Sequence, residues 1–238
     1  IVNRGFDITL GADIVTTRDW RWNVSVMGST LKNKVLKRTD NGEDIINGVY
    51  IIREGQEINT FYMSKSAGVD PTTGEQLYWA YEKNADGSMK PGSEYVTNDA
   101  TVAAGCKYLQ GSRIPDIYGS ISSSLKFRGF DLGLLFTYSL GGKIYDSIYN
   151  AMMEPSFVGQ TYHRNALRTW TAPGQRTDVP RTTTTASTQI TDRYLVDASY
   201  FAVKNISLGY SLPKRLLGKV GIESLRVYLA ADSPWTFT

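Results

Sequence analysis

The chain of 238 residues has one cysteine and one histidine, and its charges almost cancel, with 26 basic and 23 acidic residues. A single cysteine excludes an internal disulfide and a cysteine-rich zinc site. A single histidine excludes a zinc site built on a histidine pair, so metal chemistry would have to rest on carboxylates alone. The near-neutral balance gives no reason to expect a nucleic-acid partner. We therefore expect no metal, no other cofactor and no nucleic acid.

Long apolar runs are missing too. No stretch approaches about 18 consecutive apolar residues, which excludes a transmembrane helix, and the first residues do not form a signal peptide. These absences do not establish a soluble protein, because the strands of a membrane β-barrel are apolar only at alternate positions.

Catalytic motifs are also absent. The sequence contains no phosphate-binding loop and no Gly-x-Ser-x-Gly elbow. A Ser-His-Asp triad would have to use His163, which lies in a polar part of a long connection. We therefore expect no catalytic residue and no enzyme.

Alternation with a period of two is the main positive signal, and it is strongest in residues 117–140. Apolar residues there alternate with small polar ones such as Ser120, Ser122 and Ser124, and the phase resumes after Arg128-Gly129. Glycine accepts a positive φ without steric cost, so this dipeptide predicts a two-residue hairpin turn. Each arm has roughly ten residues, the length that a tilted strand needs to cross a bilayer.

Two further strand pairs flank this hairpin, and they comprise residues 6–15 with 20–27 and residues 200–210 with 225–231. Trp20 and Trp22 lie at the turn end of their strand, where an aromatic girdle would meet the membrane interface. The last pair is joined by a connector that opens with Pro213 and has room for one helical turn. We expect no strand in residues 232–238.

The connector after Pro213 is basic. Its cations are Lys214, Arg215 and Lys219. They either bind anionic lipid headgroups at the inner leaflet or belong to a solvated turn.

Two very long connections, about residues 32–114 and 141–196, separate the strand pairs. Connections of this length are uncommon in compact domains and usually carry function. All the tight turns fall on the same side, and tight turns that alternate with long loops are typical of an outer-membrane barrel. The sequence therefore predicts an all-β fold, an antiparallel transmembrane β-barrel portion of about six to eight strands with long extracellular loops.

The number of spanning strands depends on residues 50–82. Residues 57–62 and 76–81 have β character and either cross the membrane or form an extracellular hairpin. Charges on both faces of residues 53–57 favour the hairpin, because they would be costly in lipid. Six strands are too few for a single-chain barrel, and an open sheet would leave unpaired edges in lipid. We therefore expect either a piece of a longer chain, which we favour, or a ring of several copies.

Five motifs follow one another along nearly the whole chain, and they are residues 3–11 (NRGFDITLG), 68–74 (GVDPTTG), 130–142 (FDLGLLFTYSLGG), 168–181 (RTWTAPGQRTDVPR) and 198–210 (ASYFAVKNISLGY). Together they resemble the SusC/RagA family of TonB-linked outer-membrane receptors. One motif departs from the family pattern, since Arg-Trp-Thr is replaced by Arg168-Thr169-Trp170-Thr171.

The resemblance implies that residues 1–238 are the C-terminal part of a receptor barrel of about 22 strands. In that family an N-terminal plug seals the barrel, TonB drives import, and a SusD-like surface lipoprotein covers the extracellular mouth. The cargo is an oligosaccharide or, in some members, a peptide. The plug and the TonB-contacting segment match nothing in this chain. The implied location is the cell outer membrane of a Gram-negative, Bacteroidota-like bacterium.

Aromatic residues in the two long connections are candidates for cargo binding, because sugar rings stack on flat apolar faces. The candidates are Tyr78, Trp79, Tyr81, Tyr145, Tyr149, Tyr162 and Trp170. The alternative is that these rings pack the connections against one another or against the lipoprotein. For the whole chain, the alternative to nutrient import is a soluble, secreted all-β glycan-binding or adhesion protein whose apolar strand faces meet in a sandwich core.

Overall fold

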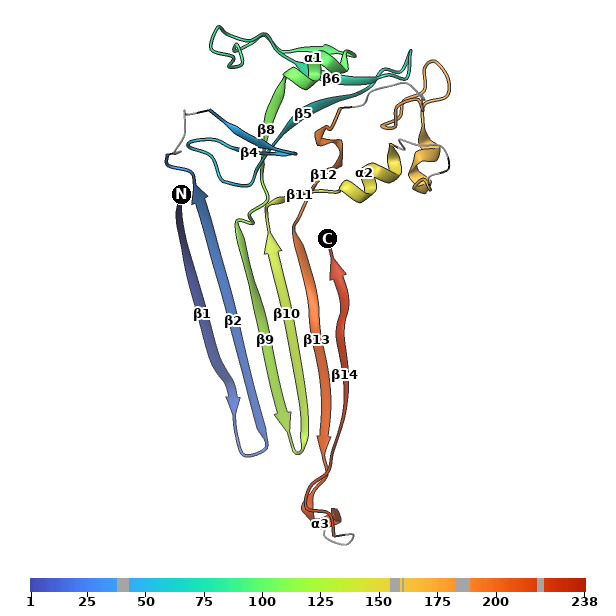
Figure 1. Ribbon diagram of the computed structural model, residues 1–238. Helices are drawn as coiled ribbons and strands as arrows, with labels where there is room; N and C mark the ends of the chain where they lie inside the picture. Colours follow the sequence, from blue (N-terminus) through green and yellow to red (C-terminus); the bar gives the residue numbers. More distant parts are fainter. Residues whose placement is uncertain (38–42, 155–158, 160, 183–188, 218–220) are drawn as a thin grey trace. The chain divides into compact units, whose positions relative to one another are not determined.

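The computed structural model describes residues 1–37, 43–154, 159, 161–182, 189–217 and 221–238. These residues form mostly antiparallel β-strands with a few short helices (Figure 1). They divide into two compact units, of which unit 1 comprises residues 34–113 and 143–197 and unit 2 comprises residues 2–33, 114–142 and 198–238. In the described residues, no helix is both long and apolar enough to cross a membrane.

Unit 2 is one six-stranded sheet with the order β1-β2-β9-β10-β13-β14. Its strands are β1 (Val2–Thr16), β2 (Trp20–Lys34), β9 (Ile117–Phe127), β10 (Phe130–Leu140), β13 (Tyr200–Ser211) and β14 (Arg226–Phe237). Strands distant in sequence lie side by side in it, because β2 pairs with β9 and β10 pairs with β13 (Figure 1).

The hairpin predicted at Arg128-Gly129 is confirmed. Both residues have positive φ angles, 45° and 95°, and Phe127 pairs with Phe130 across the turn. Two positive φ angles make a turn whose twist matches that of the flanking strands. The neighbouring turns are tied to this one, because the Arg128 amide donates to the Asp19 carbonyl and the Ser211 amide donates to the Gly129 carbonyl.

All tight connections of unit 2 lie at the same end of its sheet, as expected. They are residues 17–19, 128–129 and 212–225, the last containing α3 (Lys214–Leu217). The two long segments leave from and return to the other end, because each joins neighbouring antiparallel strands there. The tight turns therefore lie at one end of the sheet, and the strands connect to both long insertions at the other end.

The expectation that residues 232–238 form no strand is wrong, because β14 continues to Phe237. Trp235 pairs with Val203 and Phe237 pairs with Phe201. A bulge interrupts the alternation, since the register shifts at Val203 and Ser233 has a φ of 50°. The bulge changes which residues face each side, so the period of two breaks in the sequence although the strand continues.

Unit 1 contains the two long insertions. Residues 34–113 form a second sheet with the order β3-β4-β5-β6-β7, and β8 pairs with β5. Its elements are β3 (Ile45–Asn47), β4 (Tyr50–Ile52), β5 (Thr60–Val69), β6 (Gln76–Ala80), β7 (Tyr95–Thr97), α1 (Ala100–Gly105) and β8 (Lys107–Ser112). Ile51, Phe61 and Met63 are fully buried in it. The β5–β6 hairpin therefore belongs to this sheet and adds no strand to the sheet of unit 2.

Residues 143–197 complete unit 1 with short elements, which are β11 (Lys143–Tyr145), α2 (Ser147–Met153), η1 (Arg164–Arg168), η2 (Asp192–Tyr194) and β12 (Leu195–Asp197). β11 pairs with β12, and Met153, Val179 and Tyr194 form a small core. Elements of three to seven residues carry too few alternations to be recognised from sequence.

Candidate functional site

One face of the unit 2 sheet is largely apolar. Cross-strand partners share a face, so Trp22 of β2, Leu125 of β9, Leu132 of β10 and Leu208 of β13 lie in one row across four strands. The end strands continue this face, and Leu10 of β1 remains 69% exposed. The remaining apolar residues of this face include Phe6, Ile8, Ile14, Trp20, Val24, Val26, Ile121, Phe127, Phe130, Leu134, Phe136, Ile206, Tyr210, Val227 and Leu229.

The opposite face is polar and mostly small. Its residues include Asp13, Asn23, Ser25, Ser120, Ser122, Ser124, Gly133, Thr137, Ser139, Ser207 and Asp232. Polar groups on this face bind one another, since the Asn23 amide donates to Asp13 at 3.0 Å and the Asn205 amide donates to Asp232 at 2.7 Å. A sheet with one apolar and one wet face suits a wall between lipid and a water-filled lumen.

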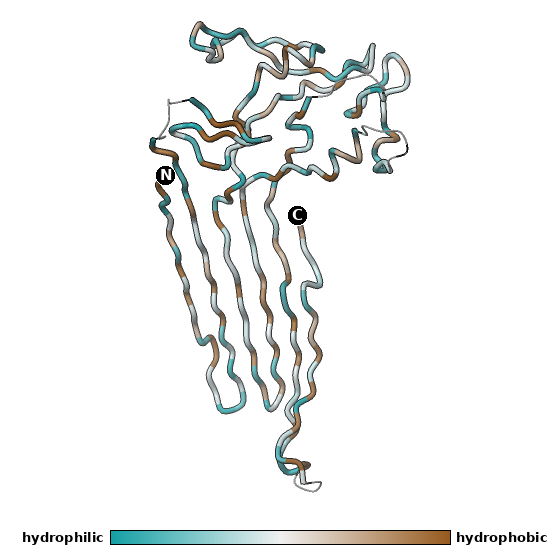
Figure 2. Tube along the Cα trace, viewed as in Figure 1, coloured by the Kyte–Doolittle hydropathy of each residue, from teal (hydrophilic) through white to brown (hydrophobic). Residues whose placement is uncertain are grey.

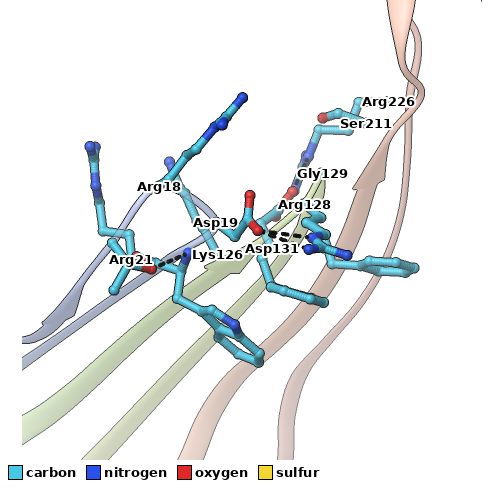
Figure 3. Close-up of a pocket in the computed structure, with 13 residues that line it drawn as sticks. Arg18, Asp19, Arg21, Lys126, Arg128, Gly129, Asp131, Ser211 and Arg226 are labelled. Atoms are coloured by element: carbon cyan, nitrogen blue, oxygen red, sulfur yellow. Dashed lines mark hydrogen bonds and ion pairs between the residues drawn. The ribbon is translucent and has the colours of Figure 1, made fainter.

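A hollow with a volume of about 530 Å³ lies at the tight-turn end of this sheet (Figure 3). Five basic and two acidic residues line it, together with the aromatic rings of Trp20, Phe127 and Phe130. Both carboxylates are taken, because Arg128 binds Asp19 with Nη2 at 2.9 Å and Arg226 binds Asp131 with Nε at 3.0 Å. The other cations, Arg18, Arg21 and Lys126, have no ion-pair partner in the described part of the chain.

The other basic residues near this end follow Pro213. Lys214 and Arg215 lie in α3 and are exposed, while Lys219 lies outside the described residues. The hollow is not evident in the sequence, because its side chains come from three separate turns and meet only when β2, β9, β10, β13 and β14 pair.

The predicted aromatic residues of the first insertion occupy different environments. Tyr78 and Tyr81 are only 2% and 7% exposed, so protein atoms cover their rings. The Tyr81 hydroxyl donates to the Lys107 carbonyl at 3.0 Å, and burial raises the pKa of Tyr81 to about 12. Trp79 is half-buried, and the Lys65 ammonium lies 5.4 Å from the centroid of its ring. Trp79 is the most exposed of the three residues.

In the second insertion, Tyr145 and Tyr149 are half-buried around the core of Met153, Val179 and Tyr194. Burial raises the pKa of Tyr145 to about 12. Tyr162 lies outside this core and is 46% exposed. His163, the only histidine, caps η1 by accepting the Asn165 amide on Nδ1 at 3.2 Å, and its ring meets that of Tyr149 edge to face.

Trp170 joins the two insertions. Its indole donates to the Pro71 carbonyl at 3.0 Å, and its ring lies directly against Gly74, where a Cβ would overlap it. Arg181 binds the same turn twice, through its amide to the Gly74 carbonyl at 2.8 Å and through its guanidinium to Glu75 at 2.8 Å. Two motifs that are about 100 residues apart in sequence therefore pack against each other.

Cations lie beside aromatic rings elsewhere on the unit 1 sheet. The Tyr62 ring has the Arg53 guanidinium at 5.3 Å and the Lys107 ammonium at 6.0 Å from its centroid. Lys65 also lies 5.5 Å from the centroid of Tyr108. These pairs are not evident in the sequence, because they join residues of separate segments of unit 1.

Groups that would hold a metal ion are not found in the described ranges, where no three His, Cys, Asp or Glu side chains gather.

The chain is similar in sequence and in structure to known proteins. No family model matches the chain. Over 99% of its length it is 27% identical to the TonB-dependent receptor P3 of Formosa agariphila, and over 88% it is 22% identical to the TonB-dependent receptor SusC of Bacteroides thetaiotaomicron. Solved structures of the RagAB peptide importer match 99% of the chain at 27% identity, with TM-scores of 0.83 in the closed-closed state and 0.76 in the open-open state.

The chain is related to the TonB-dependent receptors of the SusC/RagA family. The resemblance drawn from five sequence motifs is thereby confirmed, as is the expected fold class, an all-β portion of a receptor barrel. The chain spans about a quarter of the length of these relatives, 24% of receptor P3 and 26% of the matched RagAB chain. Its six-stranded sheet thus corresponds to part of a TonB-dependent receptor, and the relatives are receptors and an importer, whose names describe no enzyme.

Proposed function

We propose that this chain forms part of the wall and two extracellular loop regions of an outer-membrane importer driven by TonB. The observation that carries the proposal is the division of the unit 2 sheet, apolar on one face and small and polar on the other, with every tight turn at one end. This is the pattern of an outer-membrane barrel with periplasmic turns and extracellular loops. Figure 2 shows brown positions separated by pale or teal ones along parts of the long strands.

The sheet also supports a larger assembly. β1 and β14 are its end strands, and each has a free edge in the described residues. Backbone groups at such edges would be unpaired in lipid, where no water can satisfy them. Further strands of the same receptor, rather than of a second copy, are the partners we propose, since the relatives are about four times as long.

The cargo we propose is an oligosaccharide or a peptide, held by the insertions and released into the lumen without bond chemistry. Among the predicted aromatic residues, Trp79, Tyr145, Tyr149, Tyr162 and Trp170 are exposed or half-buried and remain candidates for contacts with cargo. Tyr78 and Tyr81 lie in the core and support the strand that carries Trp79. A SusD-like surface lipoprotein is the partner we propose at the extracellular side.

Sidedness is the sharpest test of this function. In the intact receptor on cells, a cysteine replacing Ser88 of the first insertion should react with a membrane-impermeant maleimide. A cysteine replacing Thr17 of the β1–β2 turn should react only after the outer membrane is permeabilised. Cys106 is buried, so the unmodified receptor is the background control. Labelling of Thr17→Cys on intact cells would contradict the proposed orientation.

Import itself is tested by growth and uptake. Deletion of the receptor should abolish uptake of either a defined oligosaccharide pool or a defined peptide pool, and a surface lipoprotein should copurify with the receptor. Tyr162→Ala should weaken cargo binding, whereas Met89→Ala, a change at another exposed position of unit 1, should not. A receptor that stays monodisperse in buffer without detergent would favour the soluble adhesion protein instead.

A further inference from the structure

The register of β1 against β2 follows from two side-chain contacts. Towards the end of the sheet that connects to the insertions, the Asn33 amide donates to Asn3 at 2.6 Å. Further along both strands, the Asn23 amide donates to Asp13 at 3.0 Å. The two contacts belong to one antiparallel register without a shift, because both strands advance by the same number of residues between them. Each residue of β1 between these contacts therefore has a defined partner on β2.

This register makes Arg4 of β1 the cross-strand partner of Lys32 of β2. The pair belongs to the apolar face, because Arg4 is two residues from Phe6 and successive side chains of a strand alternate. Both cations are exposed, and neither has an ion-pair partner in the part of the chain that the structure describes. Like charges placed opposite one another destabilise a sheet, so an anion from outside would stabilise this pair.

The two cations lie just beyond the apolar band of β1. Phe6 and Ile14 bound the apolar residues of this strand and are 77% and 51% exposed. At about 3.4 Å per residue and a tilt of about 40°, the stretch between them covers roughly 20 Å, close to the band of about 25 Å on an outer-membrane barrel. Arg4 lies about 5 Å further out by the same geometry, which is the level of lipid headgroups.

The tight-turn end of the sheet is arranged differently. Aromatic rings occupy the apolar face there, including Trp20, which is stacked on Phe127 with ring centroids 4.0 Å apart. The basic strand residues Arg21 and Lys126 pair with each other on the polar face. The Arg4–Lys32 pair therefore gives the apolar face a basic rim at the end that connects to the insertions.

We propose that Arg4 and Lys32 bind a phosphate group of the anionic glycolipid in the outer leaflet of the outer membrane, while Phe6 contacts the start of its acyl chains. The inference rests on the proposed function, which directs the apolar face to lipid and the insertions to the extracellular side. Lipid A suits this surface, because it joins phosphate groups to acyl chains and the cations and apolar side chains share one face. The bound phosphate also relieves the repulsion between Arg4 and Lys32.

The test uses the intact receptor, delipidated in a neutral detergent and titrated with bis-phosphorylated lipid A under native mass spectrometry. The comparison lipid is the same lipid A after enzymatic removal of both phosphates. Each basic residue near an anionic lipid contributes about a fivefold gain in affinity, so the double variant R4Q/K32Q should bind roughly 30-fold more weakly. The matched control is R21Q/K126Q, which removes a basic cross-strand pair of the same composition from the polar face and should bind like the wild-type receptor.

Each outcome decides the proposal. Selective loss in R4Q/K32Q, with weak binding of the dephosphorylated lipid throughout and near wild-type binding by the charge-conserving variant R4K/K32R, supports it. Equal binding by R4Q/K32Q and R21Q/K126Q overturns it and assigns the cations to carboxylates of a neighbouring strand. Equal binding of the two lipids by the wild-type receptor overturns recognition of the phosphate. Displacement of lipid A by an equal concentration of inorganic phosphate overturns the lipid as the ligand.

Failure of this proposal is distinguishable from failure of the proposed function. Heat-modifiable migration in gels reports whether each variant is folded, and the maleimide pattern on cells does not depend on Arg4 or Lys32. If that pattern holds while R4Q/K32Q binds lipid A normally, the importer and its orientation remain and only the glycolipid site is lost. Labelling of Thr17→Cys on intact cells would instead remove the orientation on which both proposals depend.

Discussion

An arginine placed on the apolar face of the unit 2 sheet should destabilise the receptor according to its depth in the bilayer. Leu134 lies near the middle of β10, between Ser123 of β9 and Ile206 of β13. A guanidinium at the bilayer midplane costs about 2–4 kcal/mol, and near the interface about 0–1 kcal/mol. Leu134→Arg should therefore lower the equilibrium constant for folding roughly 30-fold to 1,000-fold at constant conditions.

Two variants provide the comparison. Leu140→Arg carries the same change at the end of β10, where Leu140 pairs with Ile117, and should cost about 0–1 kcal/mol. Ser122→Arg lies at the level of Leu134 but on the polar face, opposite Leu135, and should cost less than about 1 kcal/mol because a wet lumen solvates the charge.

The assay is urea unfolding of the intact receptor in phospholipid vesicles, followed by tryptophan fluorescence and by heat-modifiable migration in gels. The order of stability should be wild type, then Ser122→Arg and Leu140→Arg, then Leu134→Arg. Equal losses for Leu134→Arg and Ser122→Arg would refute the assignment of the two faces. Equal losses for Leu134→Arg and Leu140→Arg would refute the location of the apolar face in a bilayer, because the cost of a charge in the core of a soluble sandwich does not depend on membrane depth.

Two further predictions concern unit 1. Gly74→Ala should cost about 2–4 kcal/mol of stability, because Gly74 has a φ of 72° and the new Cβ would overlap the Trp170 ring. The contact between the insertions should loosen, and proteolysis of residues 161–182 should become faster. The control, Gly87→Ala, has a similar φ of 81° but nothing within 4 Å of the new Cβ, and should cost only about 1–2 kcal/mol; an equal effect of the two variants would show that the Trp170 contact is not the cause. Below pH 10 the Tyr81 hydroxyl is protonated in both the folded and the unfolded chain, but above pH 10 it ionises first in the unfolded chain, because burial raises its pKa in the folded chain to about 12. The free energy of unfolding, measured by alkaline unfolding, should therefore fall between pH 10 and about 12. Tyr81→Phe should reduce this fall, and an unchanged pH profile in the variant would contradict the raised pKa.

The sequence alone determined the local features of unit 2. Alternation with a period of two predicts which residues share a face, because successive side chains of a strand point to opposite sides. Arg128-Gly129 predicts its hairpin turn, since the two residues that follow Phe127 must adopt positive φ. The motif order was enough for the resemblance to TonB-dependent receptors. Where a bulge shifted the phase, at Val203 and Ser233, the same reasoning ended β14 too early.

Only the tertiary structure decided what separate segments do together. Pairing of β2 with β9 across the first insertion brings Arg21 opposite Lys126, and nothing in either strand's own pattern indicates that neighbour. Burial of Tyr78 and exposure of Tyr162 are likewise decided by packing, because both are aromatic residues in polar surroundings of the sequence. The local pattern of a strand indicates which of its side chains face water. Which residue lies opposite each of them depends on the pairing of segments that are about 100 residues apart in sequence.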